Sequence, residues 1–78
     1  MPYWVKVVVD FTGTKSEAQS HLFDTRDEAY AELSKIKAAQ AMFTDNPERY
    51  DEAANLLPDW LSVHSVGQIV VAAVEGSG

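Results

Sequence analysis

The 78-residue sequence contains no cysteine. This absence excludes disulfides, thiolate metal sites and a cysteine nucleophile. A domain this short without disulfides must be stabilised by an apolar core or by self-association. Nearly half of the residues are apolar (46%), so a core can form without a structural metal. The absence of cysteine is also compatible with a reducing compartment.

Long apolar runs are absent as well. No stretch approaches the roughly 20 apolar residues that a membrane-spanning helix needs. The first eleven residues are too interrupted by polar side chains to form the apolar region of a signal peptide. We therefore expect a cytoplasmic protein without a membrane partner.

Catalytic and cofactor-binding signatures are missing from the chain. Its four glycines form neither a phosphate-binding loop nor a dinucleotide fingerprint, and no nucleophile motif surrounds its serines. His21 and His64 are too few, without well-placed carboxylates, to bind zinc. Asp10, at the end of an apolar segment, is a candidate for a desolvated general base, but an Asp in this position more often accepts backbone amides in a turn. The sequence therefore predicts no catalytic residue, no cofactor and no metal.

Positive charge is scarce, with six Lys and Arg against twelve Asp and Glu, a formal net charge of −6. Direct nucleic-acid binding is not expected, because it needs clustered cations. Residues 24–59 hold nine acids and four bases. This segment, called here the acidic helical layer, is either an ordinary solvated surface or a docking surface for a basic partner. In its extreme form such a surface mimics the charge of a nucleic acid.

The longest helical signal covers residues 25–43. Thr25 followed by Glu28 is a capping box, which predicts a helix start. An apolar stripe at helical spacing then predicts the buried face, formed by Ala29, Leu33, Ile36, Gln40 and Phe43. The residues assigned to the solvent side are Arg26, Glu32, Ser34, Lys35 and Lys37.

The first part of the chain predicts a hairpin. Residues 3–11 alternate as a strand does, with four valines among them. Gly13 lies in the turn that follows, where a positive φ is accessible to glycine. Residues 16–23 are more polar and are expected to return as an edge strand, with a loop as the alternative for their first half.

The second part of the chain predicts a helix and two further strands. Asn46 and Pro47 begin a helix that extends to residue 57, before Pro58. Residues 60–65 are expected to form a third strand and residues 68–75 a fourth. The fourth is apolar on both faces, which favours a central place in the sheet. The alternative is one long bent strand with a bulge at Gly67.

Together these elements predict an α+β fold of the order β-β-α-α-β-β. Its four-stranded antiparallel sheet carries two helices on one face, with the strand order 2-1-4-3. Residues 1–75 are expected to form a single domain, and residues 76–78 a disordered tail.

The function favoured by these patterns is a small acidic non-enzymatic interaction module, a regulator or an inhibitor, that works as a homodimer. Its binding residues would be Glu48, Asp51 and Glu52 on the acidic helical layer. Trp4 and Trp60 would share an uncovered face of the sheet, where aromatic side chains anchor interfaces. Such a face could also join two copies of the chain.

The alternative is a small dimeric α+β ligand-binding protein or enzyme. Its pocket would lie between the sheet and the helices. The residues expected to line it are Tyr3, Trp4, Tyr50, Trp60 and His64.

Overall fold

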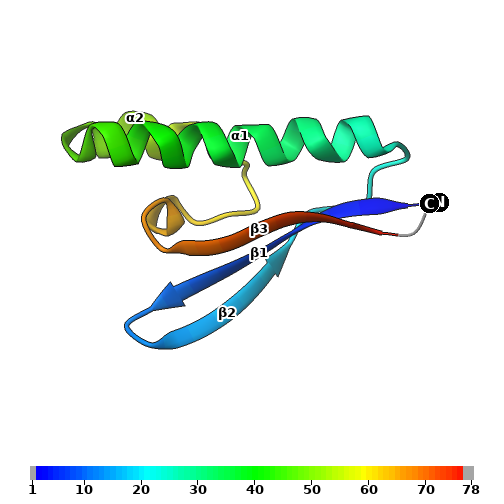
Figure 1. Ribbon diagram of the computed structural model, residues 1–78, viewed down its shortest axis with the longest axis horizontal. Coiled ribbons are helices and arrows are strands. Elements are labelled where there is room, and N and C mark those ends of the chain that lie inside the picture. Colours follow the sequence, from blue (N-terminus) through cyan, green and yellow to red (C-terminus); the bar gives the residue numbers. More distant parts are fainter. Residues whose placement is uncertain (1, 77–78) are drawn as a thin grey trace.

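The structure is a computed structural model that describes residues 2–76. In chain order its elements are β1 (Tyr3–Phe11), β2 (Thr14–Gln19), α1 (Arg26–Asp45), η1 (Pro47–Arg49), α2 (Tyr50–Asn55), η2 (Val63–Ser65) and β3 (Ile69–Gly76). The η elements are single 3₁₀ turns. Figure 1 shows the helices on one face of a three-stranded antiparallel sheet. The α+β class is therefore confirmed, whereas the fourth strand is not present among the described residues.

The hairpin between β1 and β2 closes through a two-residue turn. Thr12 has a φ of 50° and Gly13 a φ of 89°, the pair of positive values that a tight hairpin needs. The Asp10 carboxylate accepts a hydrogen bond from the Gly13 amide at 2.9 Å. Asp10 thus takes the turn-forming role, which leaves no sign of the alternative as a general base.

β2 is the exposed edge strand that its polarity predicts, but it begins and ends earlier than residues 16–23. Beyond it the pairing with β1 resumes after an irregularity. The Ser20 hydroxyl accepts from the Val5 amide at 2.8 Å, and Tyr3 and Phe23 exchange two backbone hydrogen bonds. Residues after the strand therefore stay bound to β1 without continuing a regular ladder.

The core lies between the sheet and α1. On β1, Val5, Val7 and Val9 point toward the helices and are buried. They meet the buried residues of α1, which include Ala29, Leu33, Ile36 and Ala39. α1 packs on both β1 and β3 (Figure 1). The stripe expected for this helix is confirmed at its three central aliphatic and alanine positions.

α1 begins as expected and ends slightly later. The Thr25 hydroxyl accepts from the Glu28 amide at 3.2 Å, the first bond of the predicted capping box. The helix continues to Asp45, two residues past the expected end. Glu32 was assigned to the solvent side, and this is wrong, because only 8% of the residue is exposed. The connection after α2 covers this flank of α1.

The second helix is divided rather than continuous. Pro47 opens the turn η1, as its missing amide donor favours, and α2 follows as a short helix. Ala53 and Ala54 are its buried residues. The expected helix to residue 57 is therefore shortened, because Leu56 and Leu57 already belong to the turn before Pro58.

The predicted third strand, residues 60–65, is wrong. This segment forms turns that end in η2, with a bond from the Ser65 amide to the Ser62 carbonyl at 2.9 Å. The Ser62 hydroxyl also accepts from the His64 amide at 3.2 Å. Such local side-chain bonds satisfy the backbone without a sheet partner, so alternating polarity here does not produce a strand.

β3 pairs antiparallel with β1, and the sheet order is β2-β1-β3. The predicted neighbours of the first and last strands are thus correct, but β3 lies at an edge and not in the centre. The ladder is irregular between Val8 and Val9, opposite Val70, so the bulge is not at Gly67. Gly76 pairs with Tyr3 inside the strand instead of belonging to a tail, and residues 77–78 lie outside the described part.

Candidate functional site

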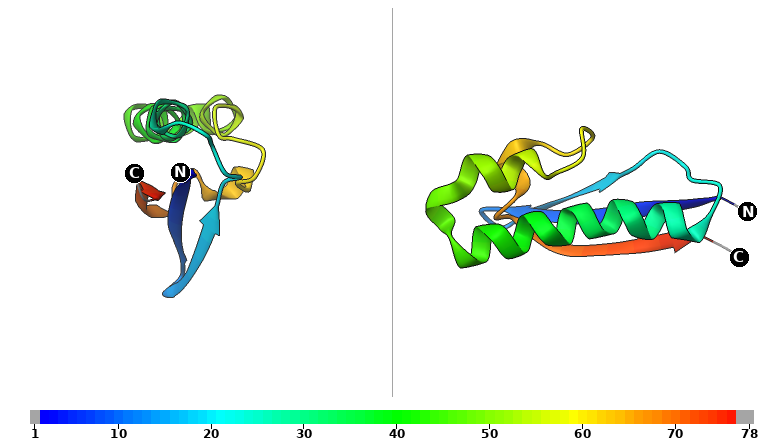
Figure 2. Two further views of the ribbon diagram at one scale, coloured as in Figure 1. Left: turned by 90° about the vertical axis from the view of Figure 1, so that its right-hand side faces the viewer. Right: turned by 90° about the horizontal axis from the view of Figure 1, so that it is seen from above.

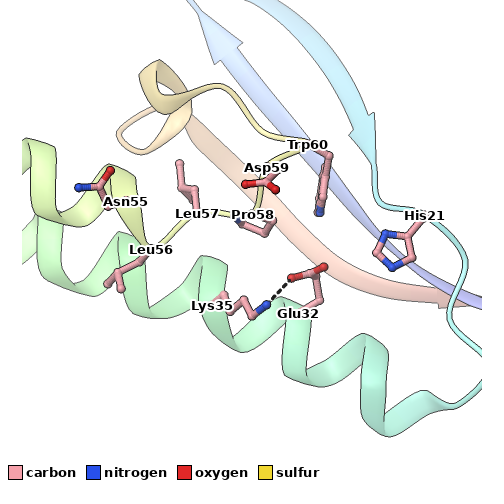
Figure 3. A pocket seen from close by; sticks show the side chains of 9 residues that line it. All are labelled: His21, Glu32, Lys35, Asn55, Leu56, Leu57, Pro58, Asp59 and Trp60. Carbon is pink, nitrogen blue, oxygen red and sulfur yellow. Dashed lines mark ion pairs between the residues drawn. The ribbon is translucent and has the colours of Figure 1, made fainter.

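A hollow of about 610 Å³ opens between α1 and the connection that follows α2 (Figure 3). We call it the Trp60 hollow. Its lining residues are His21, Glu32, Lys35, Asn55, Leu56, Leu57, Pro58, Asp59 and Trp60. Three separate segments therefore build it: the connection between β2 and α1, the middle of α1, and residues 55–60.

Glu32 supplies a buried carboxylate to this hollow. It lies on the flank of α1 that residues 55–60 cover, and only 9% of its side chain is exposed. Its Oε1 is covered and has no hydrogen-bond partner in the described chain. Lys35 Nζ lies 3.3 Å from this oxygen, which is within ion-pair range although the geometry does not make a hydrogen bond. The Lys35 side chain is 63% exposed, so its ammonium is mostly hydrated and compensates the buried charge only in part.

Trp60 supplies an aromatic face and an unused donor. Its indole Nε1 is covered and donates to no group of the described residues. In Figure 3 this nitrogen points toward Glu32, and His21 faces the hollow from the opposite side. The His21 ring is held against Phe23, with 4.4 Å between the ring centroids. A buried donor and a buried acceptor thus border the same space, where a molecule that offers both complementary groups would satisfy them.

The rim of the hollow combines apolar and acidic groups. Leu57 and Pro58 are buried, whereas Leu56 and Asp59 are exposed. The apolar side chains can cover a hydrocarbon stem, and Asp59 adds a second carboxylate at the entrance. The hollow therefore contains two carboxylates and one ammonium, an excess of negative charge.

The predicted binding residues Glu48, Asp51 and Glu52 are all exposed, on η1 and α2. Glu52 forms an ion pair with Arg49. The hydrogen bond from this guanidinium lowers the pKa of the Glu52 carboxyl, and the carboxylate in turn raises the pKa of Arg49. None of the three predicted acids lines the Trp60 hollow, but Glu52 lies one turn from Asn55, which does.

The two tryptophans do not share a face. Trp4 alternates with the buried valines of β1 and so points to the side of the sheet opposite the helices. Trp60 lies in the connection and borders the hollow on the helical side. The predicted sheet face that carries both is therefore not formed, because residue 60 is not part of a strand.

The alternative pocket of Tyr3, Tyr50 and His64 is not assembled either. Tyr3 lies beneath the start of α1, with the Arg26 guanidinium 5.7 Å from its ring centroid. Tyr50 and His64 do meet, with 3.5 Å between the hydroxyl and Nδ1. These two residues are absent from the lining of the Trp60 hollow, where Trp60 is the one predicted pocket residue.

Sequence reasoning missed Glu32, Lys35, Asp59 and the Leu-Leu-Pro segment as parts of one site. The helical repeat placed Glu32 in solvent, since the repeat does not show which flank a later connection will cover. The pair of leucines before Pro58 was the available signal, because two apolar residues at a chain reversal must pack back on a neighbouring element.

Comparison with protein-family models, curated proteins and solved structures finds no match for this chain. Within residues 2–76 there is no group of three metal-ligating side chains. No helix of the described chain is both long and apolar enough to cross a bilayer. The function must therefore be argued from the geometry of the chain itself.

Proposed function

We propose that the protein is a non-enzymatic interaction module whose Trp60 hollow receives an arginine side chain of a basic partner protein. The observation that carries the proposal is the Glu32 carboxylate, which is buried and has no hydrogen-bond donor among the described residues. A buried charge without adequate partners costs several kcal/mol. A guanidinium that displaced the exposed Lys35 ammonium would donate two parallel hydrogen bonds to this carboxylate.

The remaining walls fit the same side chain. The Trp60 ring offers its face to a cation, an attraction of about 0.5–2 kcal/mol that grows as water is excluded. Leu57 and Pro58 can cover the methylene stem of an arginine. The Trp60 indole donor would be satisfied by a carbonyl oxygen of the partner backbone.

The acidic helical layer would act before contact is made. Its excess of acids, including the exposed Glu48 and Asp51, creates a field that attracts a basic surface and raises the association rate. Binding should therefore weaken as salt is added, mostly through slower association. Loss of a distant surface acid should alter the rate, whereas loss of Glu32 should alter the affinity itself.

The proposal can be tested by NMR titration, because the indole signals of Trp60 and Trp4 are separate reporters. The probe is a blocked glycine-rich peptide with one arginine, and the control is the same peptide with neutral citrulline. We expect the arginine peptide to shift the Trp60 indole signal and to leave that of Trp4 unchanged. Citrulline should bind at least about tenfold more weakly, since a charged hydrogen bond contributes roughly 1.5–3 kcal/mol.

Glu32→Gln is the decisive variant and Glu28→Gln its matched control. Both remove one negative charge from α1, but Glu28 is exposed and does not line the hollow. Glu32→Gln should lower the affinity at least about tenfold, and Glu28→Gln should lower it less than about twofold. Equal losses in the two variants would refute a specific site and leave only diffuse electrostatic attraction.

A free small molecule with a guanidinium or ammonium group is the second candidate. The volume of the hollow, about 610 Å³, lies within the range of small-ligand sites. Blocked free arginine, titrated in parallel with the peptide, separates the two candidates. A free molecule that binds as tightly as the peptide would favour a ligand-binding protein over an interaction module.

A further inference from the structure

We infer that the free edge of β3 pairs with β3 of a second copy of this chain, antiparallel across a two-fold axis, to make one continuous six-stranded sheet. This inference goes beyond the proposed function, because the β3 edge and the Trp60 hollow lie on opposite flanks of α1 (Figure 2). It also differs from the expected dimer through a sheet face with two tryptophans, which the structure does not form.

The two edges of the sheet differ in how they are protected. β2 presents Lys15 and Glu17 and is polar throughout, the usual defence of an edge strand against pairing. β3 contains no proline and carries no charge before Glu75. On β3, Val70 is 56% exposed and Val71 is 52% exposed. In the view from above in Figure 2, no element of the described chain lies beyond β3. The β3 edge is thus an apolar strand without a neighbour.

The backbone groups on this edge can be assigned by alternation. Tyr3 and Val5 direct their amide and carbonyl groups toward the β2 side, where they bond Phe23 and Ser20. In an antiparallel ladder the next residues along β1 must then bond β3. Their partners Ala73 and Glu75 face inward, so Ala72 and Val74 direct their amides and carbonyls outward. These outward groups form a regular row of donors and acceptors.

A two-fold pairing satisfies this row. When Ala72 of one copy pairs with Val74 of the other, all outward groups meet in hydrogen-bonded pairs, and Ala73 lies opposite its own counterpart on the axis. The side chains of paired residues then stay on the same face, so both helical layers cover the same side of the joined sheet. Glu75 lies opposite Val71 in this register and does not meet a second carboxylate.

The position of α1 favours a second copy over an unrelated strand. α1 packs on β1 and β3 alike. Adjacent strands are about 4.8 Å apart, so two copies joined at β3 would place their α1 axes roughly 10 Å apart. This is the ordinary distance of packed helices, about 8–10 Å. Tyr30 lies about 200° around the helix from Glu32, on the flank that would face the other α1, and it is 50% exposed.

The test combines mass measurement with a single-cysteine cross-link, which the absence of native cysteine makes unambiguous. Sedimentation of the native chain should give twice the monomer mass of 8.6 kDa from micromolar to millimolar concentration. Opposed Ala73 residues would have Cα atoms about 4.5 Å apart, a separation that a disulfide can bridge. Ala73→Cys should therefore form a covalent dimer rapidly on mild oxidation. Ser16→Cys, on the exposed β2 edge, should not.

Two variants test the same edge without a cross-link. Ala72→Pro removes an outward amide and no bond to β1, which edge strands tolerate. Val71→Lys places a charge beside the axis on the open face. Each should weaken the dimer at least about a hundredfold while the helical circular dichroism is retained. A native chain that sediments as a monomer throughout would overturn the inference. So would a dimer that survives Val71→Lys, or equal cross-linking of the two cysteine variants.

Discussion

Replacement of Glu32 by leucine should make the protein more stable and at the same time abolish binding in the Trp60 hollow. Glu32 is buried on the flank of α1, and its Oε1 has no hydrogen-bond donor in the described chain. Leucine is similar in size and also favours helices, so the substitution changes charge far more than shape or helix propensity. A residue kept for binding and not for folding should show this opposite effect on the two properties.

The magnitude follows from three contributions. Replacing a poorly compensated buried charge by an apolar side chain gains about 1–4 kcal/mol. The repulsion between Glu28 and Glu32, one turn apart, also disappears, which adds roughly 0.2–0.5 kcal/mol. Loss of the pair with the exposed Lys35 removes about 0.3–0.5 kcal/mol. The net expectation is a gain of about 1–3 kcal/mol, which corresponds to a rise in Tm on the order of 5–15 °C.

Urea and thermal unfolding followed by circular dichroism measure this change. The comparison must use one protein concentration, because association shifts apparent stability. Glu28→Gln isolates the repulsion term, since it removes the same like-charge pair without opening the hollow. A loss of stability of about 1 kcal/mol or more in Glu32→Leu would refute the reasoning. In that event Glu32 would be a structural residue with unrecognised partners, and its role in binding would lose its basis.

Other consequences of the packing can be checked in the same unfolding assay. Ile36 is fully buried in the core, so Ile36→Ala should cost about 2–5 kcal/mol, and a cost near zero would contradict the helix register. A Cβ on Gly67 would lie 2.9 Å from Phe43 Cε1, so Gly67→Ala should cost roughly 1–3 kcal/mol. In a Phe43→Leu background, where the ring is gone, most of this cost should vanish, which a double-mutant cycle measures. Arg49 lowers the pKa of Glu52 from its ordinary value of 4.5, so the contribution of this pair is present above that pH and is lost as the pH falls through the lowered value. Glu52→Gln should therefore flatten part of the acid limb of stability against pH and change little at neutral pH, where the exposed pair is screened by salt.

The elements that were correctly predicted depend on contacts between residues close in sequence. The cap of α1 is a bond between Thr25 and Glu28, and its buried face follows the helical repeat. The hairpin turn needs a positive φ at Gly13, which the glycine itself announces. Such features are encoded within a few residues, and sequence alone is sufficient to find them.

The features that were missed depend on contacts between distant segments. The alternating pattern of residues 60–65 resembles a strand, but the side chain of Ser62 closes a local turn instead. The Trp60 hollow exists because the connection after α2 folds back on α1 and covers Glu32. No local pattern states which flank of a helix such a connection will cover. Burial of Glu32 and the place of Trp60 therefore could not be predicted from spacing.

Two disagreements between pattern and structure point to the two proposed surfaces. Glu32 has the pattern of a solvated residue but is buried, and β3 has the pattern of a central strand but lies at an edge. Proteins tend to violate such local rules where they bind something. A bound guanidinium would resolve the first conflict, and a second β3 would resolve the second.

The two proposals together predict bivalent binding. A dimer joined at β3 would carry both helical layers on one face, with one Trp60 hollow on the outer flank of each α1. A peptide with two arginines on a linker long enough to reach both hollows should bind about a hundredfold more tightly than the single-arginine peptide, because the second contact is intramolecular. Ala72→Pro should abolish this gain and leave the affinity of the single-arginine peptide unchanged. If the gain persisted in the monomeric variant, both arginines would be binding to one copy, and the two hollows would not cooperate through the sheet.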